Sequence, residues 1–71
     1  MIAPLSGRFS LAELAREMER EVLLREAVYP GRVRSGKMGP QEARRRTEMA
    51  REVVRLLRAA AEAEDGQERL L

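Results

Sequence analysis

Apolar residues recur every three or four positions in two long stretches of this 71-residue chain, and a short segment rich in Pro and Gly separates the two stretches. Such spacing places the apolar side chains along one side of an α-helix. No segment alternates apolar and polar residues in the manner of a half-buried strand. The sequence therefore predicts an all-α fold, a two-helix antiparallel hairpin with a structured elbow.

The first helix is predicted over about residues 11–29. Ser10 can cap its N-terminus, with Glu13 three residues later to complete a capping box, and Phe9 before the cap can form a hydrophobic staple. Its apolar stripe consists of Leu11, Leu14, Ala15, Met18 and Val22. Pro30 is expected to end this helix, because the residue before a proline is disfavoured in the α conformation.

The second helix is predicted over about residues 40–64. Gly39 stands at the cap, Pro40 at the first helical position, where its missing N–H costs nothing, and Glu42 at the third. Its apolar stripe consists of Ala43, Thr47, Ala50, Val54, Leu57 and Ala61. The pair Asp65-Gly66 is expected to end it.

The chain is expected to divide into a flexible N-terminal arm at 1–9, a helical hairpin at 10–64 and a C-terminal tail at 65–71. The helices would measure about 28 Å and about 37 Å, so the second should extend beyond the first by about two turns. Two apolar stripes make a thin core in so short a chain. We therefore expect the hairpin to pair into a homodimeric four-helix bundle.

Residues 30–39 are predicted to form the elbow. Gly36 can adopt the left-handed conformation that ends a helical turn. Val33 and Met38 would then fold inward beside Tyr29. With Pro30, these residues are the predicted structural elements of the elbow.

The same segment fits a nucleotide-binding pattern, because Gly31 to Lys37 reads G-x-x-x-x-G-K. A phosphate-binding loop of that kind needs a strand before the first Gly and a Ser or Thr after the Lys. Here a helix is predicted before Gly31, and Met38 occupies the hydroxyl position. We attribute the match to a coincidence, since turns are commonly composed of such residues, and no nucleotide cofactor is expected.

The composition limits the possible chemistry. The chain has neither Cys nor His, which excludes disulfides, thiol catalysis and ordinary zinc sites. No hydroxyl has a His or Cys beside it to activate a nucleophile, and the carboxylates are expected on outer helix faces. We therefore expect a non-enzymatic protein without cofactor or metal. No apolar run is long enough to span a membrane, and the start MIAPLSGRFS lacks a signal-peptide pattern, so a cytoplasmic protein without a membrane partner is expected.

Positive charge is concentrated in the second half of the chain. Residues 1–30 carry a net charge of −1, residues 31–60 a net charge of +6, and residues 61–71 a net charge of −3. The candidate partner-binding residues are Arg32, Arg34, Lys37, Arg44, Arg45, Arg51, Arg55 and Arg58. Four of them follow helical spacing and fall in one outer stripe, namely Arg44, Arg51, Arg55 and Arg58.

Three interpretations of these basic residues remain open. They could bind another protein, since Arg is suited to bidentate recognition of carboxylates. They could follow the phosphates of a nucleic acid, although Glu48 and Glu52 interrupt the field and no aromatic side chain lies on that face for stacking. They could also form a solvated face. The acidic first helix could pair with them within the fold or across a dimer.

The run "LAREMEREVLLREAVYPGRVRSGKMGPQEARRRTEMAREVVRLL" resembles a recurring type of short helical-hairpin protein of phages and prophages from GC-rich bacteria. The matching positions are Glu19, Leu23, Arg25, Tyr29, Pro30, Val33, Gly36, Lys37, Met38, Glu42, Ala43 and Met49. The resemblance covers roughly residues 12–57. The chain departs from the pattern at Gly31, where a larger residue is common, and at Gly39, which replaces a hydroxyl cap.

The resemblance implies a small phage-encoded accessory protein, of a kind that acts by stoichiometric binding. We therefore expect the chain to bind another protein through its Arg-rich elbow and second helix, and to inhibit a host or anti-phage defence complex. The alternatives are a nucleic-acid-binding accessory protein that uses the Arg stripe and a structural helical component of a phage assembly.

Overall fold

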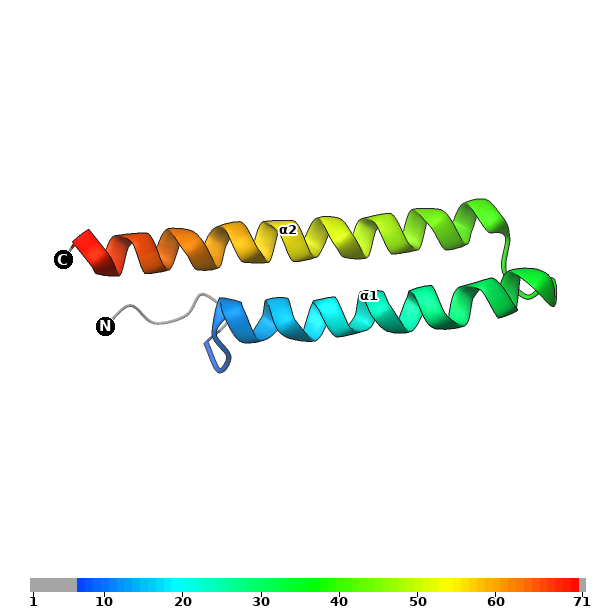
Figure 1. The fold of residues 1–71 in the computed structure, drawn as a ribbon, viewed down its shortest axis with the longest axis horizontal. Helices are drawn as coiled ribbons and strands as arrows, with labels where there is room; N and C mark the ends of the chain where they lie inside the picture. Colours follow the sequence, from blue (N-terminus) through cyan, green and yellow to red (C-terminus); the bar gives the residue numbers. More distant parts are fainter. Residues whose placement is uncertain (1–6, 71) are drawn as a thin grey trace.

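The computed structural model describes the backbone of residues 7–70 and the side chains of residues 7–66. Two helices, α1 (Leu11–Arg34) and α2 (Pro40–Leu70), run antiparallel to each other along their lengths (Figure 1). The described residues include no strand. The predicted all-α hairpin is thus confirmed. Most of the predicted flexible arm, residues 1–6, lies outside the described residues.

The start of α1 is held by its cap. The Ser10 side-chain oxygen accepts a hydrogen bond from the Glu13 backbone N–H at 3.0 Å, and the Ser10 carbonyl accepts one from Leu14 N–H at 3.0 Å. The first bond satisfies one of the amide groups that a helix N-terminus leaves without partners, and the second is the first backbone hydrogen bond of the helix.

The end of α1 is closed by a glycine in the left-handed conformation. Gly36 has a φ of +77°. Its N–H donates to the Val33 carbonyl at 3.1 Å, and the Lys37 N–H donates to the Arg32 carbonyl at 2.9 Å. This pair of bonds is the Schellman arrangement, which turns the chain sharply out of a helix.

The expected end of the first helix at residue 29 is wrong, because α1 continues through Pro30 to Arg34. Tyr29, Pro30 and Val33 therefore lie within α1, and the elbow is shortened to residues 35–39. A proline inside a helix removes one backbone hydrogen bond and disfavours the helical conformation before it, but it does not always end the helix. Here the additional turn brings Val33, which is half-buried, to the side of α1 that faces α2.

The expected end of the second helix is also wrong. The helix α2 continues through Asp65 and Gly66 to Leu70, where a separate tail at 65–71 was expected. A single glycine costs a helix only about 1 kcal/mol relative to alanine, which a long helix can tolerate. Leu71 lies outside the described residues.

The core between the helices is thin and built mainly from small side chains. The buried apolar residues are Leu11, Ala15, Val22, Ala43 and Ala50. Three of these five are alanines, and no described side chain larger than alanine is fully enclosed. Alanine contributes little apolar area, so the contact between α1 and α2 supplies a small part of the burial that a stable domain needs.

The hairpin is a rod with Cα extents of 53 × 18 × 15 Å. The elbow lies at one end, and at the other end α2 extends past the start of α1 (Figure 1). At 1.5 Å per residue, α1 spans about 36 Å and α2 about 46 Å. Both helices are longer than expected from the sequence, so the overhang of about two turns remains but moves toward Leu70.

Candidate functional site

Ion pairs across the hairpin define one side of the rod, which we call the charged face. Arg51 Nη2 lies 2.8 Å from Glu26 Oε2, and Arg58 Nε donates to Glu19 Oε1 at 2.6 Å. Glu19 and Glu26 are seven residues apart on α1, as are Arg51 and Arg58 on α2, so each pair occupies one row on its helix. The two rows therefore face each other along the hairpin.

The predicted Arg stripe is consequently largely engaged within the chain. Arg51 and Arg58 pair with α1, and Arg55 forms an ion pair with Glu52 on its own helix. All these side chains remain partly exposed, and such surface pairs contribute only about 0.2–1 kcal/mol each. Of the four residues that share the stripe, only Arg44 has no ion pair among the described residues.

The remaining predicted binding residues gather at the elbow end of the rod. We call Arg32, Arg34, Lys37, Arg44 and Arg45 the elbow cluster. All five are exposed, and within the described part of the chain none of them forms an ion pair. The last turn of α1, the elbow and the first turns of α2 bring them to one end of the molecule. The structure thus divides the eight predicted residues into an unpaired group at the elbow and a paired group farther along α2.

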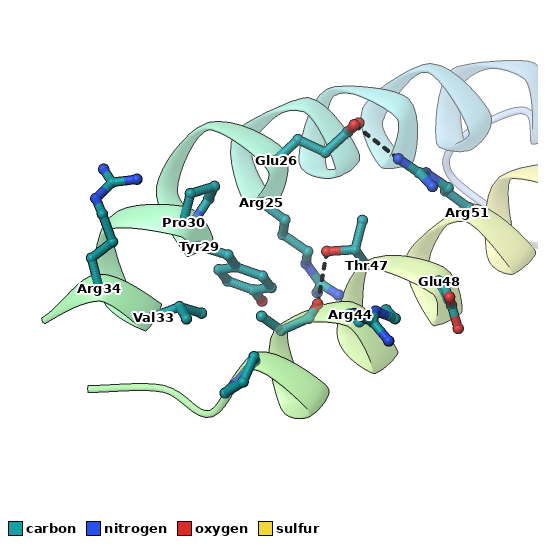
Figure 2. Close-up of a pocket in the computed structure, with 12 residues that line it drawn as sticks. Arg25, Glu26, Tyr29, Pro30, Val33, Arg34, Arg44, Thr47, Glu48 and Arg51 are labelled. Atoms are coloured by element: carbon teal, nitrogen blue, oxygen red, sulfur yellow. Dashed lines mark hydrogen bonds and ion pairs between the residues drawn. The ribbon is translucent and has the colours of Figure 1, made fainter. Parts of the chain in front are cut away.

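An open groove of about 570 Å³ runs between the two helices beside the elbow cluster, and we call it the elbow groove (Figure 2). Tyr29 reaches from α1 toward α2 within it, next to Pro30 and Val33. The full lining consists of Arg25, Glu26, Tyr29, Pro30, Val33, Arg34, Pro40, Ala43, Arg44, Thr47, Glu48 and Arg51. The floor is therefore apolar and aromatic, and charged side chains surround it.

The polar groups around the elbow groove are not equally available. The Thr47 hydroxyl donates to the Ala43 carbonyl at 2.9 Å, and Arg51 is held by Glu26, as the dashed lines in Figure 2 mark. Arg34 and Arg44 form no ion pair with any described residue, and the same holds for Glu48. Arg44 lies beside the apolar floor, whereas Arg34 stands at the edge of the groove with its guanidinium group directed away from α2 (Figure 2). A free guanidinium group can bind a carboxylate bidentately.

The opposite side of the rod, which we call the apolar face, has a different character. On α1, Leu14, Met18 and Val28 fall in one row with Arg25; on α2, Met49, Val53 and Leu56 fall in one row with Arg46. Arg25 Nη1 donates to the Arg46 carbonyl at 2.8 Å, which places the two rows side by side. Exposed fractions of 50% at Met49, 39% at Val53 and 63% at Leu56 show that α1 leaves this row uncovered.

Two features of the site are not evident from the sequence. One is the elbow groove itself, because it requires α1 to continue past Pro30 and bring Val33 opposite Ala43. The other is Arg25, which pairs with Glu21 at 3.0 Å and also donates to the Arg46 carbonyl of α2. The spacing of four between Glu21 and Arg25 is visible in the sequence, but the bond between helices is not.

The described side chains offer few other sites. Among residues 7–66, no polar or charged side chain is buried, and no group of three carboxylates is placed to hold a metal ion. Gly31 and Lys37, the ends of the nucleotide-binding pattern, lie respectively inside α1 and in the elbow. None of the described helices is both long and apolar enough to cross a membrane. Comparison with protein-family models, with curated proteins and with solved structures finds no significant match.

Proposed function

We propose that this chain is a non-enzymatic binding protein that docks an acidic surface of another protein against its elbow cluster and elbow groove. The observation that carries the proposal is the division of the basic residues. Arg51, Arg55 and Arg58 pair with carboxylates of the hairpin, whereas the five residues of the elbow cluster do not. Unpaired charges next to an apolar groove are free to contribute to binding, because they have no internal partner to lose.

An acidic protein surface fits these features better than a nucleic acid. The groove floor formed by Tyr29, Pro30 and Val33 offers apolar area that a phosphate backbone does not use. Glu26 and Glu48 also line the groove, so a continuous run of phosphates would meet repulsion there, whereas a protein segment can place neutral side chains beside them. A protein segment can place an apolar side chain over Tyr29 and direct carboxylates toward Arg34 and Arg44. Interfaces commonly combine an apolar centre with a polar rim in this way.

In this proposal, two copies of the chain form a homodimeric four-helix bundle. The small core and the uncovered Met49, Val53 and Leu56 support this part of the proposal, since a second copy would bury the apolar face. Inhibition of a host or anti-phage defence complex and a cytoplasmic location also belong to the proposal. Those two points rest only on the resemblance to small phage proteins and on the sequence arguments against catalysis.

Capture from a nuclease-treated host lysate tests the elbow as the binding site. The test variant is Arg34→Glu combined with Arg44→Glu. The control variant is Arg16→Glu combined with Arg20→Glu, which changes the net charge equally at two exposed residues of α1 without an ion pair among the described residues. We expect the wild type and the control to retain the same protein and the elbow variant to lose it.

Two outcomes would overturn the proposal. The first is that the elbow variant retains the same protein as the wild type, or that the wild type retains none. The second is that the retained material disappears with nuclease treatment and the chain instead binds mixed-sequence DNA with a steep salt dependence, which is the signature of phosphate contacts. That result would favour the nucleic-acid alternative.

A further inference from the structure

The two ends of the rod carry opposite charges. The elbow end holds the elbow cluster, whereas the open end holds Glu13 and Glu17 near the start of α1 and Glu62, Glu64 and Asp65 on α2. None of these five carboxylates forms an ion pair with another described residue. Arg8 and Arg16 also lie toward the open end, but the carboxylates there outnumber them. The hairpin therefore separates net positive charge at the elbow end from net negative charge at the open end along a molecule 53 Å long.

The apolar face lies between these charged ends. Its exposed residues extend from Met49 to Leu56 on α2, opposite the Met18 to Val28 region of α1. Glu21 and Arg25, which interrupt the α1 row, pair with each other at 3.0 Å and need no outside partner. Pairing through such a face in a second copy would keep the ion pair of each copy intact.

We propose that two copies pair through the apolar face in antiparallel orientation, so that each elbow cluster lies beside the acidic open end of the other copy. This inference rests on the homodimer of the proposed function and specifies its geometry. In a parallel pair, the two elbow clusters would lie side by side, as would the two acidic ends. Juxtaposed like charges oppose association, whereas complementary charges favour it and fix the register. A two-fold axis perpendicular to the rod makes both ends complementary at once.

Two rods paired through this face can make a contact large enough for a stable dimer. The apolar face itself, about 21 Å long from Leu14 to Val28, forms only the centre of that contact. Rods that overlap over about 40 Å along a side 18 Å wide would cover roughly 700 Å² per copy, or roughly 1,400 Å² in total, within the standard range of about 1,200–2,000 Å² for specific interfaces. In the antiparallel register, the end of α2 that extends past α1 would also lie beside the elbow of the other copy. Because the apolar face is centred near residue 21 of α1, the elbow of one copy falls beside residues 65–70 of the other.

The antiparallel pair would bind two partner molecules. The elbow groove, with Glu26 and Arg51, belongs to the charged face, on the side of the rod away from the apolar face. Pairing through the apolar face therefore leaves both grooves open. The two-fold axis places them at opposite ends and on opposite sides of the dimer, so one dimer can bridge two copies of the acidic partner or two sites of a repeated assembly.

Spin labels on single cysteines distinguish the two orientations, since the chain contains no natural Cys. Gln41→Cys marks the elbow end and Ala63→Cys marks the open end; both residues are exposed and neither belongs to the apolar face. From the centre of that face, Gln41 is about 20 Å away along α2, so two Gln41 labels in an antiparallel dimer lie about 40 Å apart. When chains with Gln41→Cys are mixed with chains with Ala63→Cys, the two labels of an antiparallel mixed dimer lie less than about 25 Å apart. The distance is short because the two positions lie at similar heights along the rods and neighbouring helix axes are only about 10 Å apart.

The parallel dimer reverses both distances. Two Gln41 labels would then lie within about 25 Å, and the mixed pair would lie about 33 Å apart or more. That reversed result overturns the proposal, and so does the absence of any intermolecular distance at a concentration of about 100 times that used for capture. Circular dichroism of each labelled chain establishes that it is folded.

A separate variant keeps this test independent of the partner. Val53→Asp places a charge in the apolar face, and we expect it to abolish the intermolecular distances while the helix content remains measurable. The elbow variant Arg34→Glu with Arg44→Glu reverses two charges of the elbow cluster, so we expect it to weaken the antiparallel association without abolishing it, because the apolar face and the other three charges of the cluster remain. If the wild type captures no protein but gives antiparallel distances, the proposed function alone is contradicted. If the wild type captures its partner but gives parallel distances, only the geometry is contradicted.

Discussion

Gly36 offers the most direct test of how the elbow is built. Its φ of +77° lies in the left-handed region, where an L-residue with a Cβ costs roughly 1–2 kcal/mol. A Cβ added at this position would meet no atom within 4 Å, so the cost of Gly36→Ala comes from the backbone conformation alone. We therefore expect Gly36→Ala to lower the free energy of unfolding by about 1–2 kcal/mol.

Thermal and urea unfolding followed by circular dichroism measure this loss. For a chain of this size, 1 kcal/mol corresponds to roughly 4–8 °C in Tm. All variants must be compared at one protein concentration, because association shifts the apparent stability. Gly36→Asn should lose less than Gly36→Ala, since Asn tolerates the left-handed region better than other residues with a Cβ.

Gly39→Ala is the matched control for this experiment. Gly39 also lies in the elbow and has open space around its Cβ position, but its φ is not positive. Alanine caps a helix less well than glycine, which lowers the free energy of unfolding, but it also restricts the unfolded chain, which raises it. We therefore expect Gly39→Ala to change the free energy of unfolding by no more than about 0.5 kcal/mol. If Gly36→Ala melts with the wild type, or if the two alanine variants lose equal stability, the reasoning about the Schellman turn is wrong.

Two further predictions concern the helices. Pro30→Ala should raise the free energy of unfolding by about 1 kcal/mol or more, because proline inside a helix costs about 3 kcal/mol relative to alanine; a lower urea midpoint would show that Pro30 contributes a compensating contact. A double-mutant cycle of Glu26→Ala and Arg51→Ala should give a coupling of about 0.2–1 kcal/mol that weakens at high salt, since side-chain exposures of 44% and 54% leave the pair in solvent. A coupling of zero at low salt would remove the reason for treating Arg51 as internally engaged.

The hairpin was predictable because each helix carries its own periodic pattern. The stripe from Leu11 to Val22 and the stripe from Ala43 to Ala61 indicate two helices without reference to the rest of the chain. The cap at Ser10 is equally local. The helix ends were less predictable, because Pro30 and Gly66 are only moderately unfavourable within a helix, and their cost competes with contacts that a sequence does not display.

The candidate site depended on information that spacing cannot provide. Arg44, Arg51 and Arg58 share one stripe by periodicity, yet only the alignment of α2 against α1 places Arg51 opposite Glu26 and Arg58 opposite Glu19. The charge pattern indicates that the acidic first helix could pair with these residues, but it does not indicate which of them pair. The unpaired elbow cluster is therefore a result of the tertiary arrangement, although each of its members was a candidate from the charge pattern.

The alanines between the helices have one more consequence. Ala15 and Ala50 present smooth, shallow surfaces, so side-chain interlocking does little to fix how far α2 is displaced lengthwise against α1. The covalent link through residues 35–39 supplies that alignment instead. Cutting the chain within this link would leave two separate helices held together only by the thin core, and they would associate in shifted alignments or separate on dilution.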